Sequence, residues 1–177
     1  MKKTPLLILI TLVFLSSCDL LSELTQFDLP YETSFSVPLI GASDSTLIVE
    51  TPTINTGIAD AMGNFNTELD LIDEITLTSL SLTLTEPVDG DFGFLSSMEI
   101  FINAAGQEEL QLAFNTAVAE DVGAVLNLET TAVDIQEYIK LDGFSLRFSF
   151  GTDETVLVQH DIAMNMEVHV DAKVLGL

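Results

Sequence analysis

Two histidines are the side chains of this 177-residue sequence best suited to acid–base or metal chemistry near neutral pH. His160 falls within residues 156–174, where ten consecutive even positions hold nine apolar residues and this histidine. His169 has the opposite parity, so on one strand the two rings would point to opposite faces and could not bind the same metal ion. The alternation therefore predicts a buried, hydrogen-bonded His160 and an exposed His169 in preference to a metal site.

Acidic turns are the other candidates, because calcium prefers oxygen ligands. Asp89 and Asp91 flank a glycine in a turn-like segment, and two carboxylates so close together make them calcium candidates. The glutamate that would complete an EF-hand loop is missing, however. An ordinary solvated turn is the favoured interpretation, and calcium binding at Asp89 and Asp91 is the alternative.

The sequence contains few of the residues and motifs on which enzymatic catalysis depends. No G-x-S-x-G, H-E-x-x-H, P-loop or G-x-G-x-x-G pattern occurs. Pairs of carboxylates can cleave glycosidic bonds, but 28 acidic residues supply such pairs by chance. An aromatic platform for sugars is poorly supplied, since tryptophan is absent and Tyr31 and Tyr138 are the only tyrosines. We predict a protein that is not an enzyme and needs no cofactor.

The first eighteen residues have the three regions of an export signal. Two lysines precede an apolar run over residues 6–15, and small residues then lead to Cys18. The run is about half as long as a membrane-spanning helix requires. The sequence Leu15-Ser16-Ser17-Cys18 resembles the lipobox of bacterial lipoproteins.

In that family, signal peptidase II cleaves before the cysteine, which receives a diacylglycerol and is often acylated on its amine. The resemblance implies that residues 1–17 are a cleaved signal peptide and that the lipid on Cys18, which palmitate would label, holds the chain at the membrane. Cys18 is the only cysteine, so an intramolecular disulfide and a cysteine-rich zinc site are excluded, and its place in the lipobox removes it as a catalytic thiol.

The expected location of the exported chain is the bacterial cell envelope, at the outer membrane or the cell surface. Asp19 follows the cysteine directly. An acidic residue there resembles an inner-membrane retention signal in enterobacteria and a surface-export signal in Bacteroidota. The leaflet therefore stays open.

Charge sets limits on the partners. Without residues 1–17 the chain has three basic residues against 28 acidic ones, a net charge of −25. Such a surface repels nucleic-acid phosphates and anionic lipid head groups, so we expect no nucleic-acid partner and attachment to the membrane through the acyl chains alone. A solvated acidic surface is the favoured interpretation, with calcium binding or adaptation to salt as the alternative.

Beyond Cys18 the sequence divides into a tether, residues 18–30, and a single domain, residues 31–177. Alternating apolar and polar residues predict strands along most of the domain. Helical spacing is confined to residues 58–72, where glycine and asparagine favour two short pieces, and to residues 131–139, which begin with a capping box. The predicted fold is an all-β antiparallel β-sandwich with Greek-key-like connections and two short helical insertions.

Two segments depart from a plain strand. Between residues 75 and 85 the apolar side chains change from odd to even positions after Leu77, and a β-bulge near Ser79 would restore one apolar face. Residues 156–174 would extend roughly 60 Å as one strand at about 3.3 Å per residue. We therefore predict that this last segment bends and passes from one sheet to the other.

The function predicted from these features is that of a non-enzymatic, lipid-anchored interaction or accessory module of the envelope, whose loops contact a protein or a glycan. One alternative is a carrier of a lipid or other hydrophobic ligand, with a cavity among its many leucine, phenylalanine and methionine side chains. The other is a calcium-stabilised, adhesin-like domain.

Overall fold

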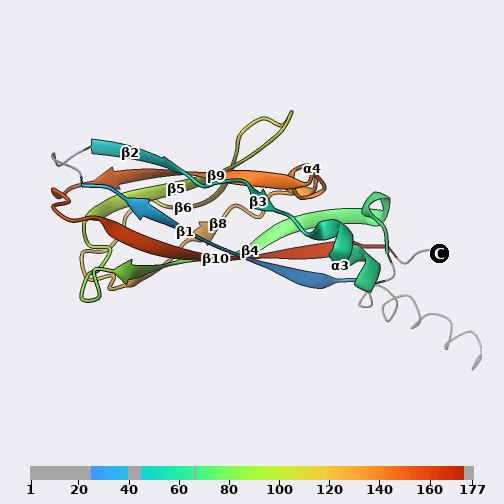
Figure 1. The fold of residues 1–177 in the computed structure, drawn as a ribbon, viewed down its shortest axis with the longest axis horizontal. Coiled ribbons are helices and arrows are strands. Elements are labelled where there is room, and N and C mark those ends of the chain that lie inside the picture. The colour runs from blue at the N-terminus through green and yellow to red at the C-terminus, as the bar shows by residue number, and fades with distance from the viewer. Residues whose placement is uncertain (1–24, 40–44, 66, 174–177) are drawn as a thin grey trace, which may run out of the picture.

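Strands make up most of the part of the chain that the structure describes (Figure 1). The computed structural model describes residues 25–39, 45–65 and 67–173. The predicted signal peptide, Cys18 and most of the predicted tether lie outside these residues. Among the described residues, no helix is both long and apolar enough to cross a membrane.

The described residues form ten strands and three short helical segments. The strands are β1 (Phe27–Val37), β2 (Ser45–Glu50), β3 (Ile54–Asn55), β4 (Ile72–Glu86), β5 (Leu95–Ala104), β6 (Leu110–Asn115), β7 (Val125–Asn127), β8 (Glu129–Thr130), β9 (Gly143–Thr152) and β10 (His160–Ala172). The helical segments are α3 (Ile58–Asn64), the 3₁₀ helix η1 (Leu69–Leu71) and α4 (Gln136–Ile139).

Two antiparallel sheets pack face to face (Figure 1). One has the order β1-β10-β4-β7, and the other has the order β2-β9-β5-β6-β8 with β3 also beside β9. Early strands pair with late ones: β1 with β10, β2 with β9, β4 with β7 and β5 with β6. This nested pairing is one long hairpin rolled into two sheets, the double Greek key of a jelly roll. The predicted antiparallel sandwich with Greek-key-like connections is confirmed.

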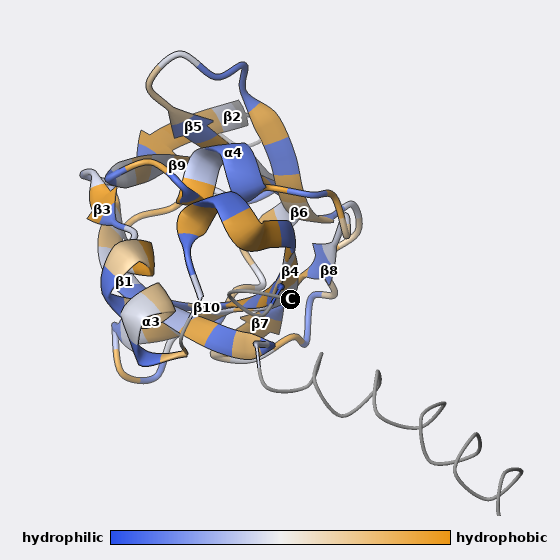
Figure 2. Cartoon of the chain, turned by 90° about the vertical axis from the view of Figure 1, so that its right-hand side faces the viewer, coloured by the Kyte–Doolittle hydropathy of each residue, from blue (hydrophilic) through white to orange (hydrophobic). Residues whose placement is uncertain are grey.

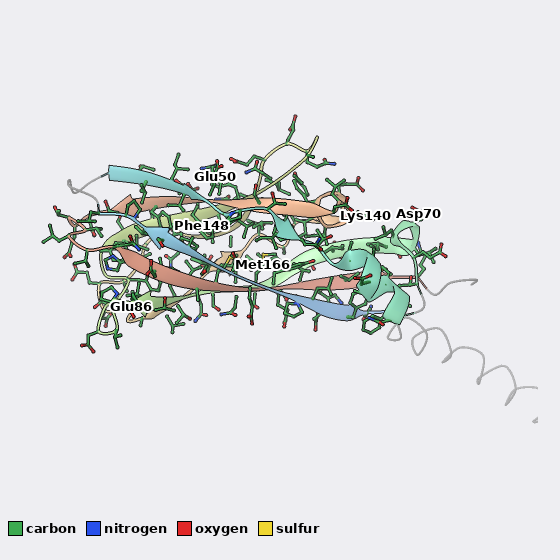
Figure 3. All side chains as sticks on the ribbon, in the orientation of Figure 1. Glu50, Asp70, Glu86, Lys140, Phe148 and Met166 are labelled. Atoms are coloured by element: carbon green, nitrogen blue, oxygen red, sulfur yellow. The ribbon has the colours of Figure 1, made fainter. Side chains whose placement is uncertain are left out.

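The two ends of the sandwich differ in what they carry. Thr25 donates a hydrogen bond to the carbonyl of Ala172, so both described chain ends lie at one end, together with α3, η1 and α4; we call it the terminal end (Figure 1). The opposite end, which we call the loop end, consists of residues 38–39, 86–94, 116–125 and 152–161. Asp70 and Lys140 lie at the terminal end and Glu86 at the loop end (Figure 3).

Apolar side chains from both sheets fill the space between them. Alternate residues are buried along the whole of β9 and β10, and apolar and polar residues alternate along the strands in the view onto the terminal end (Figure 2). Phe35 of β1 meets Phe148 of β9 with ring centroids 4.2 Å apart, and Tyr31 meets Phe144 edge-on at 5.3 Å. Within the described residues, no buried side-chain nitrogen or oxygen lacks a hydrogen-bond partner.

The predicted β-bulge is present in β4. The β10 neighbours Glu167 and Val168 pair with Ser79 and Leu77, which leaves Thr78 as the extra residue. Because of this one insertion, the apolar side chains before and after the bulge are buried on the same face.

The prediction that residues 156–174 pass between the sheets is wrong for the strand itself. β10 lies entirely in the four-stranded sheet, between β1 and β4. The crossing comes earlier, in the connection that follows β9, where Val156 is buried before the strand begins. Its pairing with β4 has three register irregularities, and the extra residue at each of them lies on β4, where it adds local twist.

The domain also begins before the predicted boundary at residue 31. β1 starts at Phe27, which is buried and stacks on Phe65 with ring centroids 4.2 Å apart. Pro30, the expected end of the tether, lies inside this strand. An edge strand tolerates proline because one of its edges needs no ladder hydrogen bonds, and β1 is an edge strand. Residues 27–30 therefore belong to the sandwich.

Both predicted helical insertions are present, at the terminal end. Residues 58–72 form two short pieces, α3 and η1, as expected for a broken helix. In residues 131–139 the helix starts later than the capping box suggests. Asp134 Oδ1 accepts the backbone N–H of Gln136 at 3.0 Å, while the hydroxyl of Thr131 donates to the carbonyl of Leu112 at 3.1 Å.

Candidate interaction surface

The two calcium candidates lie in the exposed β4–β5 connection at the loop end. Asp91 Oδ1 accepts the backbone N–H of Gly93 at 2.9 Å, so this carboxylate shapes the turn. No group of three or more histidine, cysteine, aspartate or glutamate side chains in the described residues is arranged to hold a metal ion. No third acidic, histidine or cysteine side chain among the described residues joins Asp89 and Asp91, and the calcium hypothesis gains no support.

The two histidines lie far apart in the sandwich, on opposite faces of β10 as predicted. His160 is buried, with its ring 4.4 Å from that of Phe94 and its Nδ1 3.1 Å from the carbonyl oxygen of Val158. His169 is on the outer face, with its Nδ1 2.8 Å from Asp28 Oδ1. Because they lie on opposite faces of β10, the two rings cannot share one metal ion.

Burial of His160 should make folding depend on pH. Burial lowers the pKa of His160 below its ordinary value of 6.5, more than the Val158 carbonyl and the Asp91 carboxylate raise it. The unfolded chain therefore binds a proton at a higher pH than the folded chain, and the free energy of unfolding falls as the pH drops from 7 towards 5. One proton limits this part of the fall to about 1.4 kcal/mol per pH unit.

Urea unfolding at several pH values, with His160→Gln beside the wild type, measures this contribution. The variant should lose less stability between pH 7 and pH 5. Gln159→Ala, a change at the exposed neighbouring residue, should keep the wild-type dependence. Parallel pH curves for the wild type and His160→Gln would contradict the expectation.

The connections of the loop end are packed against one another. The backbone of Gly93 in the β4–β5 connection lies so close to the β6–β7 connection that an added Cβ would be 2.7 Å from the carbonyl oxygen of Glu120. The contact between Phe94 and His160 joins the β4–β5 connection to the start of β10. The β4–β5 connection is thus supported by the β6–β7 connection and by the start of β10.

Exposed apolar side chains gather at this end. Strand register sets the connections at one level, because Val37 pairs with His160 and Glu86 pairs with Asp161. Five of the seven large apolar side chains that are exposed in the described residues belong to the loop end, each between 50% and 79% exposed. They are Leu39, Val88, Val125, Leu157 and Val158. Single exposed apolar residues are ordinary, but a concentration of them is typical of a contact surface.

The loop end is also acidic throughout. Its eight acidic residues are Glu86, Asp89, Asp91, Glu120, Asp121, Asp153, Glu154 and Asp161. Its described residues include no lysine or arginine. The three basic residues of the described chain lie elsewhere, each in an ion pair: Lys140 with Glu137, Arg147 with Glu109 and Lys173 with Asp73.

Two pockets of about 550 and 370 Å³ flank α3 at the terminal end. Met62 and Leu69 line the larger one together with Glu68 and Asp70. Lys140 lines the smaller one. Neither pocket contains a residue that the sequence singled out for chemistry.

The exposed apolar residues of the loop end were not identified from the sequence. Val88 lies in a turn-like cluster of proline, aspartate and glycine, where an apolar side chain has little to pack against. Leu157 is apolar at an odd position in a segment whose other odd positions are nearly all polar. Both irregularities indicate that these apolar side chains are exposed.

Comparison with known proteins gives no family for this chain. No family model matches it, and no curated protein matches it. A crystal structure of FLHE aligns with a TM-score of 0.37 at 8% identity, over 84% of this chain and 97% of that one. A decameric BFDV capsid protein aligns at 0.34 and 9%, over 82% and 99%, and a turnip yellow mosaic virus structure aligns at 0.27 and 11%, over 85% and 98%.

Proposed function

We propose that this chain is a non-enzymatic, lipid-anchored interaction module of the bacterial cell envelope, held at the membrane through Cys18 and presenting its loop end to a partner. One observation carries the proposal. The described chain ends lie at the terminal end of the sandwich, whereas most of the exposed apolar side chains lie at the loop end.

The short stretch of sequence between Cys18 and the first described residue fits this proposal. Thr25 follows Cys18 by seven residues, which span at most about 25 Å. A lipid on Cys18 therefore keeps the terminal end near the bilayer. The eleven residues of β1 lead away from it for about 35 Å, so the loop end is free to meet a partner.

The surroundings of the histidines support a non-enzymatic role. His160 packs on an aromatic ring and faces a backbone carbonyl, and His169 faces a carboxylate on an outer sheet face. A nucleophile activated by a neighbouring base requires the base within hydrogen-bond reach of a hydroxyl or thiol. The hydrogen bonds of both rings go elsewhere.

The packing of the sandwich favours the interaction module over a carrier. Phenylalanines from both sheets meet between them, and 36 apolar side chains of the described residues are buried in one cluster. A hydrophobic ligand between the sheets would have to displace these side chains. Contact through the surface needs no such change.

Replacement of the lipid attachment site tests the anchor. In cells given labelled palmitate, the wild-type chain should carry the label and sediment with membranes. Cys18→Ala should carry no label, since a single thiol provides the lipid attachment.

Ser22→Ala is the matched control, because it changes a small polar residue four positions after the cysteine and should keep both label and membrane attachment. Continued palmitate labelling of Cys18→Ala would refute the anchor.

A further inference from the structure

We infer that the partner of the loop end is a protein whose contact surface is apolar at its centre and rimmed by lysine and arginine. The inference rests on the interaction role proposed above and is independent of how the chain is anchored. It identifies the chemistry of the partner, which the interaction role alone leaves open.

The exposed apolar side chains favour a protein over a glycan. Those of the loop end are the branched aliphatic side chains of leucine and valine. Three of them are at least 64% exposed: Leu39, Val88 and Leu157. Sugar rings are usually held on aromatic faces, but Phe92 and Phe94 of this end are buried. Aliphatic side chains of this kind fit the apolar centre of a protein–protein interface.

The charge of the loop end favours a basic partner. Eight acidic residues and no lysine or arginine leave its negative charge uncompensated. A second copy of this chain docked end to end would oppose acid to acid, and an anionic bilayer would be repelled in the same way. Lysine and arginine around an apolar centre would instead attract the partner and fix its orientation.

The loop end is supported before any partner arrives. Gly93 abuts the β6–β7 connection, and the ring of Phe94 in the β4–β5 connection packs, tilted by 35°, on the ring of His160 at the start of β10. Docking on such a surface orders few additional residues, so less of the contact energy is lost to ordering.

Site-specific photocross-linking in the cells that make the protein tests the inference on the full chain. Benzoylphenylalanine replaces Val88 or Leu157 at the loop end, and in a control it replaces Ile48, which is 56% exposed on β2. We expect one discrete protein to be cross-linked from both loop-end positions, with a yield at least about tenfold above that from Ile48.

Charge reversal then tests the basic rim. Asp89→Lys with Asp153→Lys should lower the cross-linking yield at least about tenfold, because like charges would face each other. Glu68→Lys with Asp70→Lys makes the same change of charge at the terminal end and should leave the yield unchanged. The cross-linked site of the partner should be apolar with lysine or arginine beside it.

Several outcomes would overturn the inference. They are a cross-link that survives reversal at Asp89 and Asp153, a cross-link to lipid, glycan or a second copy of this chain, and no cross-link from either loop-end position. Fractionation of the same cells separates this result from the lipid anchor. A charge-dependent cross-link in a chain that is not membrane-bound would refute the anchor alone.

Discussion

Deletion of Ser81 from β4 should remove much of the stability of this protein, whereas deletion of Thr78 should leave the fold intact. Thr78 is the bulge residue, so its loss places Leu77 and Ser79 in consecutive pairs with their existing partners on β10. Loss of Ser81 instead makes Leu80 adjacent to the next leucine in the strand, so the two side chains would point to opposite faces of the sheet. The strand then has to turn at least one buried leucine out of the core.

The size of the difference follows from what leaves the core. Leu80 is 2% exposed, and removing a buried leucine costs about 2–5 kcal/mol. A serine would take its place facing the core, and an unpaired buried hydroxyl adds about 1–3 kcal/mol. Folded domains are stable by only about 5–15 kcal/mol, so the Ser81 deletion removes a large part of the total.

Denaturant unfolding of the two deletion variants beside the wild type measures this difference. The two variants have the same length and lose similar small polar residues, so each is the control for the other. Equal loss of stability would show that the bulge does not set the parity of β4.

The bulge could be predicted from the sequence because side chains alternate along a strand with a period of two. A change of parity between Leu77 and Leu80 can be resolved in few ways, and a single extra residue is the simplest. The same local rule identified the alternation of β9 and the buried face that includes His160.

The path of the last strand could not be predicted in the same way. The alternation from Val156 onwards shows only that one side of the segment is buried, and it does so equally for a strand and for an extended connection. The sheet to which this segment belongs is decided by its pairing with β1 and β4, which come from distant parts of the chain. For the same reason Pro30 looked like a boundary, since only the topology shows that β1 is an edge strand.

The loop end illustrates the same limit for function. The excess of acidic residues is visible in the sequence, but the grouping of Leu39, Val88 and Leu157 is not, because more than a hundred residues separate the first from the last. The rolled hairpin brings their connections to one end. Local pattern therefore predicted the elements, and long-range pairing determined the surface.

Replacement of Phe148 by alanine should be the most costly single substitution in the aromatic core. Its side chain is fully buried in β9, 4.2 Å from the ring of Phe35 in the other sheet and 6.0 Å from that of Phe150. Phe148→Ala opens a cavity where the two sheets meet, at a cost of about 3–5 kcal/mol. For a chain of this size the melting temperature should fall by about 10 °C.

Phe114→Ala is the matched control for this prediction. Phe114 is half-buried and pairs across strands with the exposed Glu99, so its ring lies on the outer face of the same sheet. Its removal leaves no cavity between the sheets and should lower the melting temperature by less than half as much. Calorimetry measures the melting temperatures of both variants. Equal decreases would contradict the prediction, because they would mean that the contact with Phe35 between the sheets adds nothing to the stability.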